Sequence, residues 1–247
     1  MDLRTEYVDL SVADGTSMRA YVAHPAGNPR AGLLVFQEAF GVNAHIRDVT
    51  QRFAGQGYLA ISPELFHRMA PGFESGYVDM DAAFAQLRTL TVPGLEADIR
   101  AAHAWLENAG VSQIAATGYC VGGRVACLAA LTVPLACSVS YYGGGIAPSQ
   151  TSSGLLDRLK DLKAPMLFFW GGLDHHIPQE SVQAVTNTLR AAGKTYTNVE
   201  FSFADHGFFC DARASYNAEA AAQAWTLTLA FFETHLAGET QKGGAGA

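Results

Sequence analysis

Residues 118–123 read Gly-Tyr-Cys-Val-Gly-Gly and place Cys120 where it could act as a nucleophile. The largely apolar run 113–117 before them predicts a buried strand, and residues 123–131 predict a helix. Small residues two positions either side of a nucleophile are typical of a sharp strand-to-helix turn, the nucleophile elbow, in which serine is commoner than cysteine. The positive end of the following helix would stabilise charge on the sulfur. The alternative is a tight turn that merely buries a cysteine.

Three further polar residues also follow buried apolar runs, namely Glu38, Asp174 and His206. In parallel sheets, sites form beyond the carboxyl ends of the strands, so we expect all four residues to meet. The order nucleophile, acid, histidine matches the triad of α/β-hydrolases. Cys120 would attack an acyl carbon, His206 would transfer protons, and Asp174 would orient the imidazole. The alternatives are a turn-capping role for Asp174 and a structural role for His206.

An oxyanion hole requires two backbone N–H groups that point at the developing negative charge. One donor should be the residue after the nucleophile, Val121. The other should come from the loop after the first buried parallel strand, where we predict Ala39.

The sequence predicts neither a metal nor a cofactor. His175 and His176 are adjacent, and no carboxylate or cysteine nearby has the spacing of a ligand set. The glycine runs at 122–123 and 143–145 lack the endings of phosphate-binding loops and the spacing of dinucleotide-binding loops.

Predicted strands and helices alternate from residue 31 onward, and they must position the candidate site residues. This alternation predicts an α/β fold with a mostly parallel central sheet flanked by helices. Residues 6–24 alternate apolar and polar and predict an N-terminal antiparallel hairpin. We expect one domain over 1–247, with 64–76 and the helix 78–90 near a cleft rim and 239–247 frayed. The other predicted strands cover 31–36, 58–62, 113–117, 136–142, 165–170 and 197–203. The other predicted helices cover 45–56, 95–108, 123–131, 154–162, 181–192 and 218–236. Pro93-Gly94 is predicted to separate the helix 78–90 from the helix 95–108.

The composition of the chain limits the classes of binding partner and the location that we expect. The formal net charge of −7 disfavours nucleic acid and anionic membranes. No apolar run approaches the roughly 18 residues of a membrane span, and the N-terminus lacks a signal pattern, so we expect a cytoplasmic protein. The four cysteines show no CxxC spacing, and Cys127 and Cys137 are expected to be inert core residues. A redox pair of Cys120 and Cys210 is a further alternative.

Five segments together resemble the dienelactone hydrolase (carboxymethylenebutenolidase-like) family within the α/β-hydrolase fold. The resemblance extends from about residue 8 to 236, and the cysteine elbow combined with Gln37-Glu38 is its most telling feature. The matching segments are residues 37–41, 118–123, 141–143, 171–178 and 205–208.

The resemblance implies a hydrolase that cleaves a lactone or ester through Cys120, His206 and Asp174, with an acyl-thioester intermediate. It also implies a role for Glu38, which in the family contacts the resting thiol until substrate displaces it. A carboxylate beside sulfur disfavours a standing thiolate and so protects it from oxidation. Without the resemblance, Glu38 would be interpreted as a strand-end capping residue.

One departure concerns the arginines with which dienelactone-cleaving members hold the substrate carboxylate. One of them lies four residues after the histidine, where this chain has Cys210. Arg68, Arg88 and Arg213 are candidate replacements, although each is more simply interpreted as a solvated surface arginine.

The predicted substrate is therefore a small-molecule ester or lactone, and the predicted assembly is a monomer or weak homodimer. One alternative keeps the triad but extends the range of substrates to aryl esters or phosphotriesters. Another is a catalytically silent hydrolase fold that only binds a ligand.

Overall fold

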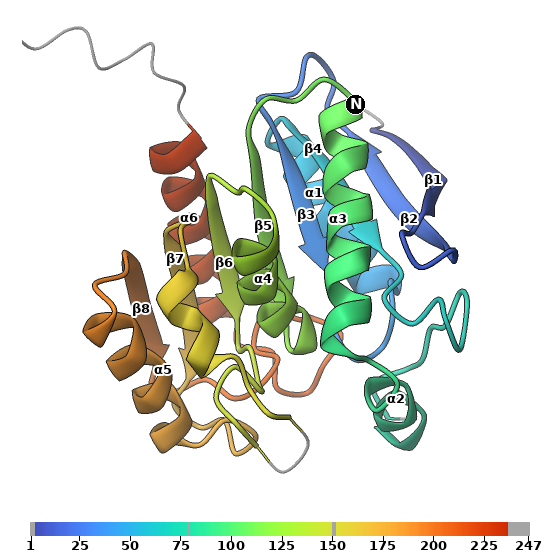
Figure 1. Ribbon diagram of the computed structural model, residues 1–247. Coiled ribbons are helices and arrows are strands. Elements are labelled where there is room, and N and C mark those ends of the chain that lie inside the picture. The colour runs from blue at the N-terminus through green and yellow to red at the C-terminus, as the bar shows by residue number, and fades with distance from the viewer. Residues whose placement is uncertain (1–2, 79, 150–151, 237–247) are drawn as a thin grey trace, which may run out of the picture.

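The computed structural model describes residues 3–78, 80–149 and 152–236 of the chain, arranged around one eight-stranded sheet (Figure 1). The strand order is β1-β2-β4-β3-β5-β6-β7-β8. The strands are β1 (Arg4–Ser11), β2 (Ser17–His24), β3 (Ala31–Phe36), β4 (Tyr58–Pro63), β5 (Ile114–Tyr119), β6 (Cys137–Tyr141), β7 (Met166–Gly171) and β8 (Tyr196–Phe201).

The sheet is mixed only at its N-terminal edge. β1 and β2 form an antiparallel hairpin, and β2 pairs antiparallel with β4. From β4 through β8 all neighbouring strands are parallel. Every residue of β3, β4 and β5 is buried, as expected for parallel strands covered on both faces. The predicted fold class and the N-terminal hairpin are confirmed.

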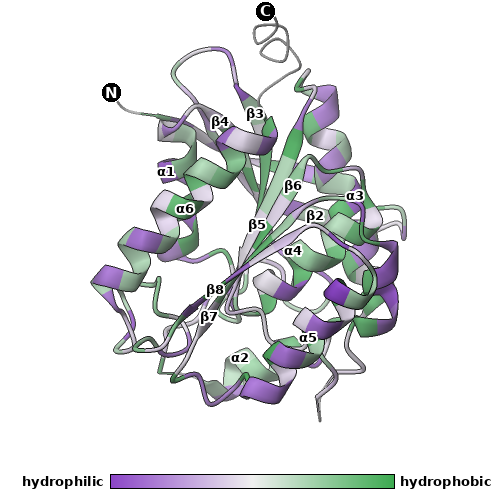
Figure 2. Ribbon diagram, turned by 90° about the vertical axis from the view of Figure 1, so that its left-hand side faces the viewer, coloured by the Kyte–Doolittle hydropathy of each residue, from purple (hydrophilic) through white to green (hydrophobic). Residues whose placement is uncertain are grey.

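Helices cover both faces of the sheet, with α1 and α6 on one side and α3, α4 and α5 on the other (Figure 2). Within the described ranges, none of the helices has the length and apolar character that crossing a bilayer requires. The helices are α1 (Ala44–Gly55), α2 (Met80–Leu87), α3 (Val92–Asn108), α4 (Val121–Thr132), α5 (Gln179–Ala191) and α6 (Ala218–Leu236), and a 3₁₀ helix, η1, spans Leu156–Asp161.

The two helices are separate, but the predicted position of the break at Pro93-Gly94 is wrong, because α2 ends at Leu87 and α3 already begins at Val92. Proline is tolerated in the first turn of a helix, where its missing N–H would have no partner in any case. The Thr91 side chain caps the helix by accepting from the Gly94 N–H. The predicted helix 154–162 forms only as the short 3₁₀ turn η1. The predicted frayed segment, 239–247, lies outside the described residues.

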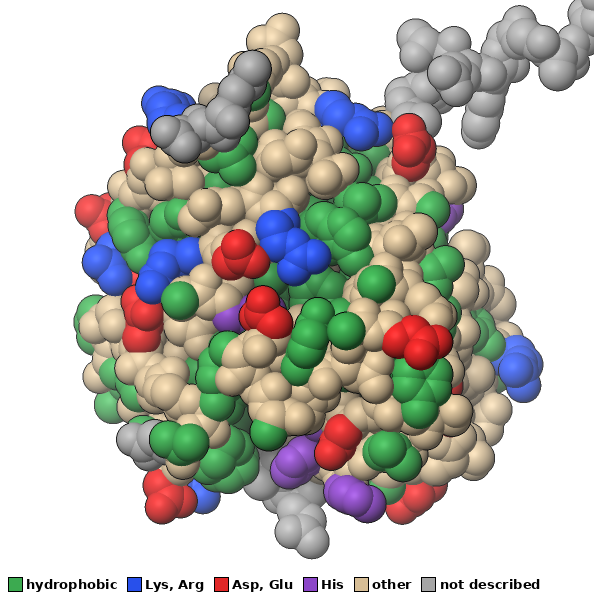
Figure 3. Space-filling view, turned by 180° about the vertical axis from the view of Figure 1, so that it is seen from behind, with side chains coloured by type: hydrophobic (Ala, Val, Ile, Leu, Met, Phe, Trp, Pro, Cys, Tyr) green, Lys and Arg blue, Asp and Glu red, His purple; other side chains and the backbone are tan. Residues whose placement is uncertain are grey.

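The face of the molecule behind the view of Figure 1 carries acidic and basic side chains interspersed with apolar ones (Figure 3). This is the side on which α1 and α6 pack. On this face, no single sign of charge gathers into a broad patch.

Candidate active site

Cys120 occupies the turn between β5 and α4 in a conformation that is unusual for a residue with a side chain. Its φ and ψ are 58° and −120°, and only a few non-glycine residues adopt positive φ. The glycines two positions either side leave no room for a Cβ, because one at Gly118 would overlap the Gly122 carbonyl. A Cβ at Gly122 would overlap the carbonyls of Phe36 and Gln37. The predicted elbow geometry is therefore present.

Replacing Gly122 by alanine is expected to lower the free energy of unfolding by about 3 kcal/mol or more. The added methyl meets backbone atoms of β3, which cannot move aside as a flexible side chain would. Urea unfolding of wild type and variant measures the difference. The control is Gly55→Ala at the end of α1, where a Cβ meets nothing within 4 Å and φ is not positive. That variant should gain about 0.5–1 kcal/mol, and equal losses in both variants would contradict the packing argument.

Asp174 and His206 meet at the same edge of the sheet, in the loops after β7 and β8. The His206 Nδ1–H donates to Asp174 Oδ2 at 2.7 Å. Asp174 Oδ1 accepts from the backbone N–H groups of His176 at 2.8 Å and Ile177 at 3.2 Å. One oxygen thus caps the turn while the other accepts from the imidazole, which is compatible with both predicted roles for Asp174. With Nδ1 occupied, Nε2 of His206 is left to face the sulfur.

The electrostatics couple His206 to its neighbours. Burial disfavours the charged imidazole, but the negative charge that Cys120 carries as a thiolate and the hydrogen bond with Asp174 outweigh burial and raise the pKa of His206. The raised pKa therefore applies to the state in which the sulfur is ionised. Burial likewise opposes the charge of Asp174, yet hydrogen bonds from His206 and the His176 N–H hold its pKa below the ordinary value. The three side chains form one coupled unit.

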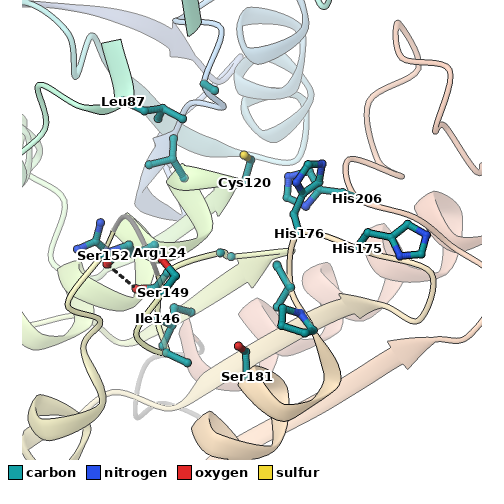
Figure 4. A pocket seen from close by; sticks show the side chains of 18 of the residues that line it. Leu87, Cys120, Arg124, Ile146, Ser149, Ser152, His175, His176, Ser181 and His206 are labelled. Atoms are coloured by element: carbon teal, nitrogen blue, oxygen red, sulfur yellow. Dashed lines mark hydrogen bonds between the residues drawn. The ribbon is translucent and has the colours of Figure 1, made fainter. Parts of the chain in front are cut away.

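A pocket of about 810 Å³ opens over this edge (Figure 4). Cys120 and His206 line it, and Figure 4 shows both side chains pointing into the same space. Ala39 and Val121, the predicted oxyanion-hole residues, line it as well. Val121 is the first residue of α4, whose first-turn N–H groups have no partner within the helix. The fold therefore brings the predicted nucleophile, base and backbone donors to one cavity.

Glu38 is completely buried behind this pocket and is paired with an arginine. Arg213 Nη1 donates to Glu38 Oε1 at 3.3 Å, and only 15% of the Arg213 side chain is exposed. Arg213 also lines the pocket. The interpretation of Arg213 as a solvated surface residue is therefore wrong, because the buried Glu38 carboxylate requires a cation beside it.

The other two arginine candidates differ from each other. Arg68 pairs with Asp14 and the buried Asp98 through bonds of 2.7–2.9 Å, and it does not line the pocket. It is a structural residue rather than a solvated one. Arg88 is exposed, as predicted, and lies on the pocket rim.

A buried cluster of Glu38, His45 and Cys210 has donor atoms within 4.8 Å of one another, the one such group with metal-ligand potential among the described residues. Glu38 Oε2 and His45 Nε2 have no hydrogen-bond partner there. The sequence spacing did not predict this cluster. Because Arg213 already pairs with Glu38, the positive charge that a metal would bring is supplied by a guanidinium.

Sequence reasoning missed Arg124, which lines the pocket from α4. It follows Cys120 by four residues, and residues at that spacing on a helix lie on one face. That spacing was the available signal.

A family model described as the dienelactone hydrolase family matches residues 18–236. A carboxymethylenebutenolidase of Pseudomonas putida is 33% identical over 243 residues, which cover 92% of this chain and 95% of that protein. A protein of Synechocystis sp., provisionally named a carboxymethylenebutenolidase, is 36% identical over 246 residues, covering 96% of this chain and 99% of that protein.

Two crystal structures of other proteins are also similar to this chain. A provisionally named dienelactone hydrolase of Klebsiella pneumoniae superposes with a TM-score of 0.86 at 33% identity, over 94% of this chain and 99% of that one. A dienelactone hydrolase-like promiscuous phosphotriesterase from metagenomic libraries has a TM-score of 0.81 at 21% identity, over 95% and 99% of the two chains. At that identity the second likeness concerns the fold alone.

Proposed function

Because the chain belongs to the dienelactone hydrolase family and is an ester-hydrolysing enzyme, we propose that Cys120 is its nucleophile and that His206 and Asp174 complete the triad. The observation that carries this proposal is the 2.7 Å bond from His206 Nδ1 to Asp174 Oδ2, with the same imidazole and Cys120 lining one pocket. This arrangement is that of nucleophile, base and orienting acid in acyl transfer.

In the proposed reaction, the Cys120 sulfur attacks the carbonyl carbon of the ester while its proton passes to Nε2 of His206. The tetrahedral oxyanion then collapses, the C–O bond breaks, and His206 returns the proton to the leaving oxygen. This leaves an acyl-thioester on Cys120. His206 next takes a proton from water, the resulting hydroxide attacks the thioester carbonyl, and the acid and free thiol are released.

The backbone N–H groups of Val121 and Ala39 are proposed to hold the oxyanion. Their place on the pocket wall beside Cys120 supports this assignment. Removal of one such donor in other enzymes costs about 2.7–4 kcal/mol of transition-state stabilisation.

Glu38 is proposed to contact the resting thiol and to move when substrate binds. Two observations support this role. Glu38 Oε2 is buried without a hydrogen-bond partner in the described structure, and Arg213 interacts electrostatically with both Glu38 and Cys120. Because Oε2 makes no hydrogen bond and Arg213 interacts with both Glu38 and Cys120, the carboxylate has a second position that it can occupy.

The enzyme acts on small-molecule esters, and we propose a lactone or aryl ester as the substrate, a monomer or weak homodimer as the assembly and the cytoplasm as the location. The four cysteines are all free thiols, which is typical of a reducing compartment and supports the last point.

The experiment that tests the mechanism is trapping of the acyl-enzyme. Wild type is mixed with p-nitrophenyl acetate, quenched in acid and digested, and the peptide that carries Cys120 should gain one acetyl group by mass spectrometry. Full turnover of lactones, aryl esters or phosphotriesters without any label on this peptide would overturn the proposed nucleophile. No turnover and no label with any substrate would favour a catalytically silent protein.

A further inference from the structure

Arg124 is a half-buried cation on the pocket wall without a counter-charge. It projects from α4 one turn beyond Cys120, and its Nε is buried with no hydrogen-bond partner. Within residues 3–78, 80–149 and 152–236, no carboxylate forms an ion pair with it. Burial disfavours its charge and lowers the pKa of Arg124, but a guanidinium stays protonated at neutral pH.

An uncompensated buried charge is costly, so such groups are normally paired. The contrast with Arg213 is informative, because that arginine lines the same pocket but already pairs with the buried Glu38. Arg158 of η1 likewise pairs with Glu96, at 2.7 Å. Arg124 therefore has positive charge available for a ligand.

The other arginines of the pocket differ from Arg124. Arg213 is neutralised by Glu38, and Arg88 is exposed to solvent on the rim. Among the described lining residues, Arg124 is therefore the part-buried guanidinium without a carboxylate partner. A cation in this position attracts ligands of the opposite sign.

The loop after β6 holds the Arg124 side chain in place. A Cβ built on Gly145 would lie 3.4 Å from both Arg124 Cδ and the Ser152 side chain, so the aliphatic stem packs in a narrow space beside this glycine. The Ser152 hydroxyl donates to the Gly145 carbonyl at 3.3 Å and accepts from the Gly154 N–H at 3.1 Å. Ser152 thus fixes the loop, and the guanidinium is left to bind the ligand.

The positions of His206 and Arg124 on either side of Cys120 indicate which part of the substrate carries the negative charge. In Figure 4, Cys120 lies between His206 on one side and Arg124 on the other. The leaving oxygen must lie on the His206 side, since this imidazole protonates it. The acyl chain then extends from the carbonyl carbon toward Arg124.

We propose that Arg124 binds a carboxylate on the acyl part of the substrate, so that the preferred substrates are half-esters of short dicarboxylic acids. This inference rests on the proposed function and names its substrate class. Arg124 follows Cys120 by four residues and lines the same pocket, which suits a short acyl chain between the sulfur and the guanidinium. A guanidinium recognises a carboxylate through two parallel hydrogen bonds.

The test compares two pairs of esters. The first pair is p-nitrophenyl hydrogen glutarate and its neutral methyl ester, which differ in the charge at the end of the acyl chain. The second pair is 4-acetoxybenzoate and phenyl acetate, which differ in a carboxylate on the leaving group. Wild type should prefer the hydrogen glutarate over its methyl ester, and Arg124→Met should reduce that ratio of kcat/KM by about 10- to 100-fold. The ratio of 4-acetoxybenzoate to phenyl acetate should not respond to Arg124→Met.

The matched control is Arg88→Met, which removes an exposed guanidinium from the rim of the same pocket and should keep the wild-type ratio. An unchanged ratio in Arg124→Met, or an equal fall in Arg88→Met, would overturn the inference. A second readout does not use turnover. Glutarate should raise the unfolding midpoint of Cys120→Ala but not of Cys120→Ala/Arg124→Met. Hydrolysis of all four esters with no dependence on Arg124 rejects this inference alone, whereas absence of any acyl-enzyme rejects the proposed function.

Discussion

Replacing Cys120 by alanine is expected to lower kcat/KM for p-nitrophenyl acetate by about 10⁴-fold or more, equivalent to about 5.5 kcal/mol of transition-state stabilisation. The loss is large because the sulfur forms a covalent bond in the intermediate, and no other side chain in the pocket replaces it at the elbow. The oxyanion donors and binding contacts would remain and account for residual activity. The measurement is steady-state hydrolysis on protein whose fold is verified by thermal unfolding.

The control is Cys127→Ala, which removes the same thiol from the next turns of α4. Cys127 is fully buried, and burial raises its pKa to about 12, so it should carry no thiolate under assay conditions. This variant should lose stability but keep kcat. Cys120→Ser should also fall far below wild type, because a hydroxyl is a poorer nucleophile in a site built around a thiol. Full activity in Cys120→Ala would reject covalent catalysis at this residue.

The fold could be predicted because its signals are local. Continuous apolar runs such as 31–36 become strands buried on both faces, and helical periodicity between them requires crossover connections. The error at α3 arose from reading Pro93 as a helix breaker without regard to position. A proline that follows a capping threonine is typical of a helix start.

The positions of the candidate site residues could be predicted as far as they depend on strand ends. Cys120, Asp174 and His206 each follow a buried strand, and a parallel sheet brings such positions to one edge. The arginines were not predictable in this way. Arg213 is separated from Glu38 by 175 positions, and only the fold shows that the pair is buried together. An arginine is equally common on a solvated surface, so its sequence neighbours carry little information about its partner.

Arg124 shows the same limit of sequence-based prediction. Its position four residues after Cys120 could be read from the sequence, but the lack of a partner for its Nε could not. Whether Arg124 has a counter-charge depends on the side chains of all the elements that surround the pocket.

Asp174→Asn is expected to lower kcat/KM by about 10³- to 10⁴-fold and to lower the pKa of His206. Wild-type Asp174 accepts from Nδ1 and therefore leaves Nε2 free to take the thiol proton. An asparagine amide can donate to Nδ1 instead, which places the proton on Nε2 and removes the base. The hydrogen bond and charge of Asp174 raise the His206 pKa, so their loss must shift it downward.

The shift is best measured by NMR titration of the His206 ring in a Cys120→Ala background, because the sulfur also raises this pKa. The double variant Cys120→Ala/Asp174→Asn should titrate below Cys120→Ala alone. The matched control is Asp205→Asn, since Asp205 Oδ1 accepts from the backbone N–H of His206 at 2.6 Å and does not bind the ring. If Asp205→Asn lowered both the activity and the pKa as far as Asp174→Asn, the charge of the loop rather than the bond to Nδ1 would control the imidazole, and Asp174 would lose its place in the triad.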